Sequence, residues 1–250
     1  MLQFDTTSWI IIMMCALMIG FSKAGIMGAG ALVVPLLVSI MPARESTGFL
    51  LPMLSIGDIT AIIYWHRHVD WSKLVRLMPW TLAGVVIGYI CLGHITDELL
   101  MPLIGVIVLF LIVLHCWQQR RPEYQSKIPR NWWFAAVMGI LAGGTSMLAN
   151  AAGPIMVIYL LAMRLDKEEF IGTAACFFLL LNLSKIPFSS KLDLITPASL
   201  MTNLAVAPLI VLGGVLGVMA VHRIPQRAFD MVMQGVTALI ALYLCLRPLL

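Results

Sequence analysis

Eight long apolar segments fill most of this 250-residue chain. They cover about residues 8–41, 46–65, 74–93, 99–118, 131–163, 169–188, 198–221 and 228–247. Six of them have roughly the twenty residues that a helix needs to cross a hydrocarbon core about 30 Å thick. Because 61% of the residues are hydrophobic and only 11% are charged, a soluble domain of this size could not bury so much apolar surface. The sequence therefore predicts an all-α polytopic membrane protein.

The first and fifth segments are too long for one straight crossing. At 1.5 Å per residue, a helix of about 33 residues would reach roughly 50 Å. Each of the two carries a similar Gly/Pro element, GFSKAGIMGAGALVVP at Gly20 to Pro35 and GILAGGTSMLANAAGP at Gly139 to Pro154. Glycine weakens a helix, and transporters break their helices where backbone must face a substrate. We therefore expect both segments to be broken or re-entrant.

The two elements head two predicted internal repeats of four apolar segments each. The first repeat covers residues 1–118, a polar linker covers 119–130, and the second repeat covers 131–250. Further landmarks keep the same order in both halves: Gly48 with Gly172, Asp58 with Asn182, Asp70 with Asp193, Pro79 with Pro208, and Gly84/Gly88 with Gly213/Gly217. Such duplication indicates a transporter whose site lies at the repeat interface. The last pair forms a GxxxG in each half, which we expect to serve close helix packing.

The loop charges distinguish two topologies. If all eight segments span, nine lysines and arginines lie on one side and five on the other. If the first and fifth segments are re-entrant hairpins, eleven lie on one side against Arg44, Lys191 and Arg247 on the other. The positive-inside rule favours the hairpins, which place both termini outside and make the repeats inverted. The arrangement with eight spans stays open as the alternative.

Two lysines lie within apolar segments and are candidates for holding an anion. A charge at the centre of a membrane helix costs about 2.5–3.5 kcal/mol on insertion scales, so it usually faces a cavity or a partner. Lys23 lies in the first Gly/Pro element, and Lys185 lies toward the end of the sixth segment. Since Lys185 is close to Pro187 and Ser189, its side chain could alternatively reach the aqueous interface.

Asp58 is the carboxylate nearest the middle of an apolar segment, and it has two interpretations. It is either a proton-coupling residue or one half of a static ion pair with Lys23 or Lys185. Asn150 and Asn182 can hydrogen-bond an anion or cap a broken helix, and Ser22, Ser55, Thr145 and Ser146 are weaker candidates. Backbone N–H groups in the Gly/Pro elements suit an oxyanion, and their candidate positions are Gly25, Gly28, Gly30 and Gly153.

Other kinds of chemistry have no support in the sequence. There is no P-loop, GxSxG, HExxH or paired-carboxylate motif, so we expect no enzyme and no nucleotide-driven pump. No basic patch with interleaved aromatics suggests a nucleic acid, and no cofactor is expected. The five cysteines lack metal-ligand spacing, and His66-Arg67-His68 has no further ligand nearby, so we expect no metal site.

The motifs taken together resemble the TauE/SafE family of sulfite and organosulfonate exporters. The resemblance rests on GFSKAGIMGAGALVVP, a following helix with an Asp, the stretch Asp70-Trp71-Ser72-Lys73-Leu74, and the echo GILAGGTSMLANAAGPIMVIYL. It covers about residues 10–246, with fewer glycines in both elements than family members usually have. The resemblance implies a multi-pass carrier of a small sulfur-containing anion in the bacterial inner membrane.

We therefore expect a secondary carrier for sulfite or an organosulfonate, with proton coupling through Asp58 as one option. An anion channel and a non-transporting membrane assembly protein are the alternatives. The expected partners are the anion and the lipid bilayer, and a homo-oligomer is left open.

Overall fold

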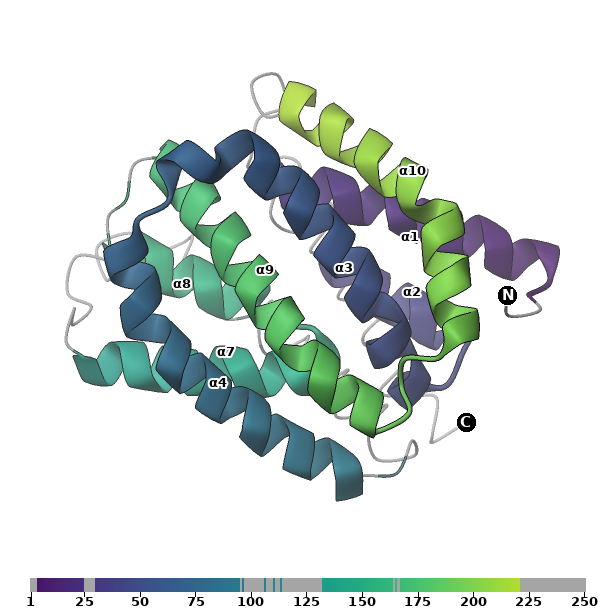
Figure 1. The fold of residues 1–250 in the computed structure, drawn as a ribbon, viewed down its shortest axis with the longest axis horizontal. Helices are drawn as coiled ribbons and strands as arrows, with labels where there is room; N and C mark the ends of the chain where they lie inside the picture. Colours follow the sequence, from purple (N-terminus) through teal and green to yellow (C-terminus); the bar gives the residue numbers. More distant parts are fainter. Residues whose placement is uncertain are drawn as a thin grey trace.

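The computed structural model describes residues 4–24, 30–94, 132–163 and 167–220, with the single positions 96, 106, 110, 113 and 165. All regular structure in these residues is helical, which confirms the predicted fold class there. The helices are α1 (Thr6–Ala24), α2 (Gly30–Val38), α3 (Ala43–Trp65), the 3-10 turn η1 (His66–His68), α4 (Trp71–His94), α7 (Trp132–Ala149), α8 (Gly153–Met163), α9 (Lys167–Lys191) and α10 (Pro197–Ala220) (Figure 1). The predicted segment 228–247, the linker 119–130 and most of the segment 99–118 lie outside the described residues.

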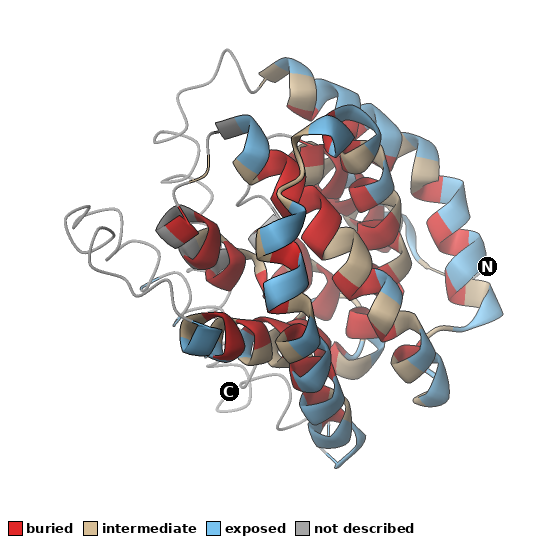
Figure 2. Ribbon diagram, turned by 60° about the vertical axis from the view of Figure 1, so that its left-hand side comes forward, coloured by how far each residue is buried: buried red, intermediate tan, exposed pale blue. Residues whose placement is uncertain are grey.

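Six of the described helical stretches are long and apolar enough to cross a bilayer. They are Thr6–Ala24, Ala43–His68, Trp71–His94, Trp132–Ala149, Glu168–Lys191 and Pro197–Ala220. Their inner faces are buried, and their outer faces are exposed (Figure 2). Many of the outer side chains are large and apolar, such as Ile63, Val75 and Leu204, which are 64–70% exposed. An apolar outer surface of this extent is what a lipid-facing bundle requires.

The two overlong segments are each divided into one long and one short helix. In the first, α1 ends at Ala24 and α2 begins at Gly30, and in the fifth, α7 ends at Ala149 and α8 begins at Gly153. The short helices α2 and α8 have nine and eleven residues. At 1.5 Å per residue they are about 14 and 17 Å long, too short to cross a core of about 30 Å. The fifth segment is therefore broken at residues 150–152, within its Gly/Pro element, whereas residues 25–29 of the first element lie outside the described residues.

One end of the bundle, called end A here, is where α1 begins. A cavity of about 590 Å³ at this end is lined by Phe4, which precedes α1, by Ser8 in the first turn of α1, and by Met41, which follows α2. Glu45 in the first turn of α3 and Thr196, just before α10, line the same cavity. The first long segment thus returns to the end from which it started, and α3 and α10 also start there.

The opposite end, called end B, is where α3 ends and α4 begins. The indole Nε1 of Trp65 donates a hydrogen bond of 3.1 Å to the carbonyl of Ala24, so α1 and α3 end side by side. His68 Nε2 lies 2.9 Å from Glu168 Oε2, which places the start of α9 here as well. The rings of Trp80 and Trp132 stack with centroids 6.0 Å apart, so α7 begins beside the first half of α4.

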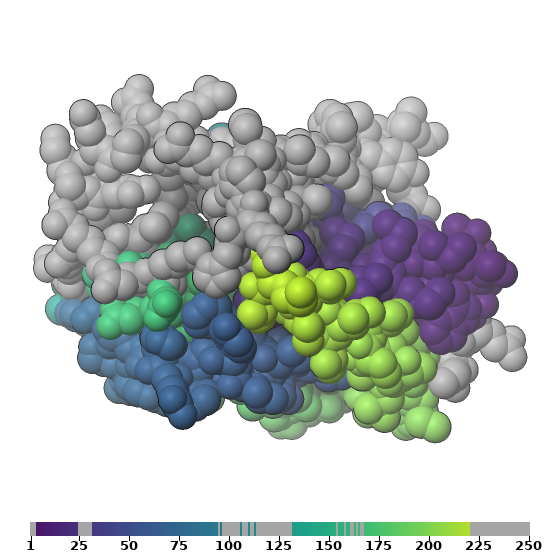
Figure 3. All heavy atoms as spheres, turned by 90° about the horizontal axis from the view of Figure 1, so that it is seen from above, coloured from purple at the N-terminus to yellow at the C-terminus, as the bar shows by residue number. Residues whose placement is uncertain are grey.

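Helices from the two halves pack closely along both flanks of the bundle. Figure 3 shows α1 and α10 side by side, and α4 packs against α7 in the same way. A Cβ added at Gly213 or Gly217 would collide with the backbone of α1, and one at Gly84 or Gly88 would collide with α7. The expectation that both GxxxG pairs serve close packing is therefore confirmed. Between these flanks, α3 packs against α9 at the centre.

Candidate functional site

A buried polar cluster lies between α1, α3, α7 and α9. It contains six side chains that the sequence named as candidates, the serine among them as a weaker one: Lys23, Asp58, Ser146, Asn150, Asn182 and Lys185. These residues are far apart in the sequence, so only the packing of the two halves brings them together. Among the described residues, no three His, Cys, Asp or Glu side chains lie close enough to hold a metal ion.

Asp58 connects helices from both halves. It lies in the second half of α3 and is completely buried. Its Oδ1 lies 2.8 Å from Lys23 Nζ on α1, and its Oδ2 accepts a hydrogen bond of 2.6 Å from Asn182 Nδ2 on α9. A buried carboxylate is tolerated when both oxygens have such partners. Of the two ion pairs that the sequence left open, the structure contains the one with Lys23.

Lys23 is held by contacts in addition to the ion pair. It lies in the last turn of α1, and its stem passes Gly57, where an added Cβ would come within 3.2 Å of Lys23 Cγ. Its Nζ lies 4.0 Å from the ring centroid of Phe178 on α9, a favourable cation–π distance. The side chain is only 15% exposed. The positive charge of Lys23 is therefore already balanced within the protein.

Lys185 differs, because its contacts are neutral. It lies one helix turn after Asn182, on the same face of α9, and is 2% exposed. Its Nζ donates hydrogen bonds to Ser146 Oγ, at 3.0 Å, and to Asn150 Oδ1. The described residues place no carboxylate in ion-pair contact with this amine. The alternative in which Lys185 reaches the aqueous interface is wrong, because the amine points into the cluster.

Asn150 links the break in the fifth segment to this lysine. It directly follows α7 and has a left-handed backbone, with φ of 51°. Asparagine tolerates this conformation better than most residues, so it can end a helix where glycine is otherwise usual. Unlike glycine, it also supplies a carboxamide, whose Nδ2 donates a hydrogen bond of 3.1 Å to the carbonyl of Thr47. One residue thus ends α7, contacts α3 and accepts a hydrogen bond from Lys185.

The first turn of α8 begins beside this break. Among the described residues, a Cβ added at Gly153 would have no neighbouring atom within 4 Å, so this part of the chain leaves space beside the start of the helix. The first N–H groups of a helix have no partner within it and, with the helix dipole, attract anions. Gly30 occupies the corresponding place at the start of α2, whereas Gly25 and Gly28 lie outside the described residues.

Sequence reasoning gave little or no weight to several contacts of the cluster. Ser146 was only a weak candidate, and Ser55 and Thr145, given equal weight, bond carbonyls of their own helices. Phe178 and the carbonyl of Thr47 were not foreseen. Phe178, Asn182 and Lys185 are spaced four and three residues apart, which places them on one face of a helix. This spacing could have identified Phe178 as a neighbour of the two polar residues.

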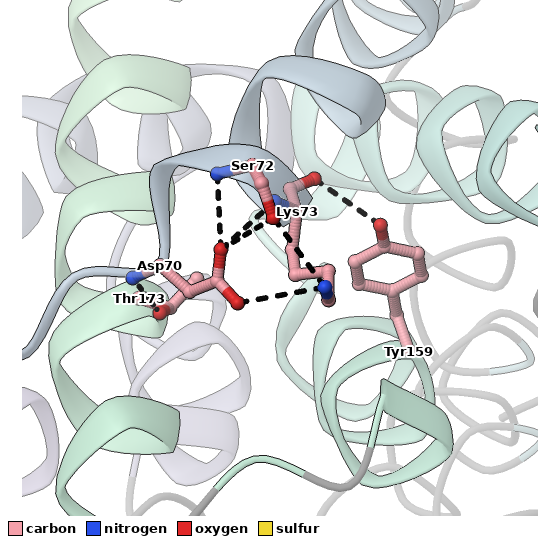
Figure 4. Close-up of polar contacts among 5 residues, drawn as sticks. All are labelled: Asp70, Ser72, Lys73, Tyr159 and Thr173. Atoms are coloured by element: carbon pink, nitrogen blue, oxygen red, sulfur yellow. Dashed lines mark hydrogen bonds and ion pairs between the residues drawn. The ribbon is translucent and has the colours of Figure 1, made fainter.

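A second polar cluster joins α4 to α8 and α9 near end B (Figure 4). Asp70 caps α4, because its Oδ1 accepts hydrogen bonds from the backbone N–H groups of Ser72 and Lys73 and from the Ser72 hydroxyl. The N–H of Asp70 donates to Thr173 Oγ1 at 2.8 Å, and the hydroxyl of Tyr159 donates to the carbonyl of Lys73 at 3.1 Å. Burial raises the pKa of the Asp70 carboxyl, but the hydrogen bonds from Ser72 and Lys73 and the positive charge of Lys73 outweigh it and lower the pKa below its usual value.

A family model described as Sulfite exporter TauE/SafE matches residues 12–244, nearly the whole chain and all of the buried cluster. Members of this family are membrane transporters and not enzymes. No curated protein and no solved structure matches the chain significantly.

Proposed function

The chain belongs to the sulfite exporter TauE/SafE family, and on this premise we propose that it is a secondary carrier for sulfite or an organosulfonate. The observation that carries the proposal is Lys185, a buried lysine whose contacts in the described part of the chain are all neutral. A buried charge is costly unless it has a counter-ion, and in this cluster an incoming anion would supply one.

The groups around Lys185 suit an oxyanion. Asn150 and Ser146 can reorient their polar groups toward a ligand, and the described residues leave space for it beside Gly153. Helix N-termini attract negative charge, so backbone N–H groups at Gly153 and Gly30 are the proposed donors, together with those at Gly25 and Gly28. A sulfite or sulfonate group presents three oxygen acceptors to such donors.

Asp58 is the proposed site of proton coupling. Protonation would remove its negative charge and break the ion pair with Lys23, which lies 2.8 Å away. The freed ammonium would then be available to the substrate, so proton uptake and anion binding would favour each other. Asn182 would position Asp58 in both states through its hydrogen bond of 2.6 Å.

We further propose that the two divided segments are hairpins in a pair of inverted repeats. The contacts at end A support this for the first segment, and the bond from Tyr159 in α8 to the start of α4 supports it for the fifth. Arg67, Lys73 and Lys167 lie toward end B, so the positive-inside rule assigns that end to the cytoplasm. A C-terminal tag should then be accessible from outside, and a cytoplasmic Leu250 would contradict the arrangement. The bacterial inner membrane and a homo-oligomer remain predictions.

Reconstitution into proteoliposomes tests the function directly. Influx of sulfite, sulfoacetate, thiosulfate and sulfate would be measured for the wild type, for Lys185→Gln and for the control Lys191→Gln, which changes an exposed lysine on the same helix. Removing one partner of a buried charged contact costs about 2–5 kcal/mol, so Lys185→Gln should weaken apparent affinity more than about tenfold.

The outcome also separates the alternatives. Influx in Lys185→Gln equal to that of the wild type and of Lys191→Gln would show that Lys185 is not part of the site. A flux that neither saturates nor responds to the proton gradient would indicate a channel. No flux of any anion through folded, correctly inserted protein would indicate a non-transporting role.

A further inference from the structure

We propose that the buried cluster, while Asp58 is ionised and paired with Lys23, selects singly charged oxoanions over doubly charged ones, and that this ion pair sets the preference. The inference rests on the proposed function and goes beyond it by specifying the charge of the substrate. It starts from an imbalance in the cluster, which holds two lysines and one carboxylate.

The charges of the cluster leave room for one negative charge. Lys23 and Asp58 lie 2.8 Å apart and neutralise each other, so Lys185 supplies at most one further positive charge. The other described groups in contact with Lys185 are the neutral Ser146 and Asn150. A bound monoanion would make the cluster neutral. A dianion would leave one buried negative charge without a counter-ion, which is strongly unfavourable.

The surrounding dipoles do not supply the missing charge. A helix N-terminus contributes only about half of an elementary charge. The Thr47 carbonyl, which accepts from Asn150, presents the negative end of its dipole to the cluster. Asp58 itself is close by, since its partner Asn182 is one helix turn from Lys185. Its carboxylate therefore repels a second negative charge as well as neutralising Lys23.

A dianion would need the ammonium of Lys23 as a second counter-ion, but that ammonium is already paired with Asp58. It also lies over the ring of Phe178. Asp58→Asn would keep a hydrogen-bonding side chain of the same size but would release this charge. The cluster would then carry two uncompensated positive charges and should accept a dianion more readily.

Counterflow in proteoliposomes without a pH gradient tests the preference independently of proton coupling. Labelled methanesulfonate would be exchanged against unlabelled competitors in two pairs: methanesulfonate with sulfate, and 2-hydroxyethanesulfonate with sulfoacetate. Each pair has similar size and differs by one charge. In the wild type, each dianion should compete at least about tenfold less well than its matched monoanion.

Two variants then test the role of the ion pair: the first raises the charge of the cluster by one, and the second restores the wild-type charge without the pair. In Asp58→Asn, the ratio by which the monoanion of each pair competes better than its matched dianion should fall about tenfold or reverse. The double variant Lys23→Met with Asp58→Asn returns the cluster to one positive charge, so it should regain the monoanion preference. A purely structural role of the ion pair would instead lower flux without changing the order of the competitors.

The wild-type competition decides the matter even where a variant does not fold. Dianions that compete as well as monoanions would overturn the charge preference while leaving the carrier function standing. The absence of counterflow with every anion would overturn both. A monoanion preference that survives Asp58→Asn unchanged would overturn the role given to the ion pair.

Discussion

Lys23→Met tests whether the central ion pair is as buried as the structure describes. The substitution keeps an unbranched apolar stem of similar length and removes the ammonium. Asp58 would remain completely buried with the hydrogen bond from Asn182 but without a counter-ion. We therefore expect this variant to be clearly less stable than the wild type.

The expected magnitudes follow from the burial of the two partners. Removing one member of a buried ion pair typically costs about 3–5 kcal/mol. Asp58→Asn should cost less, about 1.5–3 kcal/mol, because it removes a charged hydrogen bond but leaves a lysine with some solvent exposure and the Phe178 ring. The double variant contains neither charge. Its loss should therefore be smaller than the sum of the single losses by about 2 kcal/mol, within the usual range for residues in contact.

The measurement is the free energy of unfolding in mixed micelles, followed by far-UV circular dichroism during SDS titration. Lys191→Met serves as the control, since it removes an exposed lysine from the end of α9. Surface substitutions of this kind usually change stability by less than about 0.5 kcal/mol. If the losses in the two single variants add up in the double variant, the side chains are not coupled and the reasoning is refuted.

Three further predictions concern packing, pH and the second polar cluster. Gly84→Ala should lower the free energy of unfolding by about 1–3 kcal/mol, because the added Cβ would collide with the backbone of α7. Gly144→Ala at the same helix crossing should be tolerated, because its Cβ would lie 3.6 Å from the nearest atom, the Gly84 carbonyl oxygen. Equal losses for the two variants, measured by unfolding in micelles, would contradict this. The pKa of Asp70 is lower in the folded than in the unfolded chain, so its ionised carboxylate stabilises the fold above about pH 4, and this stabilisation is lost as the pH falls through the folded pKa. The free energies of unfolding of the wild type and of Asp70→Asn should therefore differ less at about pH 3 than at about pH 7. Tyr159→Phe, which removes the hydroxyl bonded to the Lys73 carbonyl, should lower the free energy of unfolding by about 0.5–1.5 kcal/mol, and an unchanged value would show that water replaces this bond.

Local chemistry made the helices, the breaks and the candidate residues predictable from the sequence. Apolar runs of about twenty residues form membrane helices regardless of what packs beside them, because the bilayer leaves their backbone no other way to satisfy its hydrogen bonds. The overlong segments and their Gly/Pro elements indicated breaks for the same local reason, and the described break at residues 150–152 lies in the second element. Charged side chains such as Lys23, Asp58 and Lys185 are conspicuous in apolar surroundings, so each could be identified singly as a candidate.

Only the tertiary structure decided which of these groups interact. The sequence allowed Asp58 to pair with either lysine, because partner choice depends on how α1, α3 and α9 are rotated and shifted against one another. In the folded chain Lys23 forms the ion pair with Asp58, while Lys185 donates hydrogen bonds to Asn150 and Ser146. That division leaves the amine of Lys185 without a carboxylate partner in the described part of the cluster. The arrangement arises from long-range packing between the two halves, and no local pattern in the sequence could have revealed it.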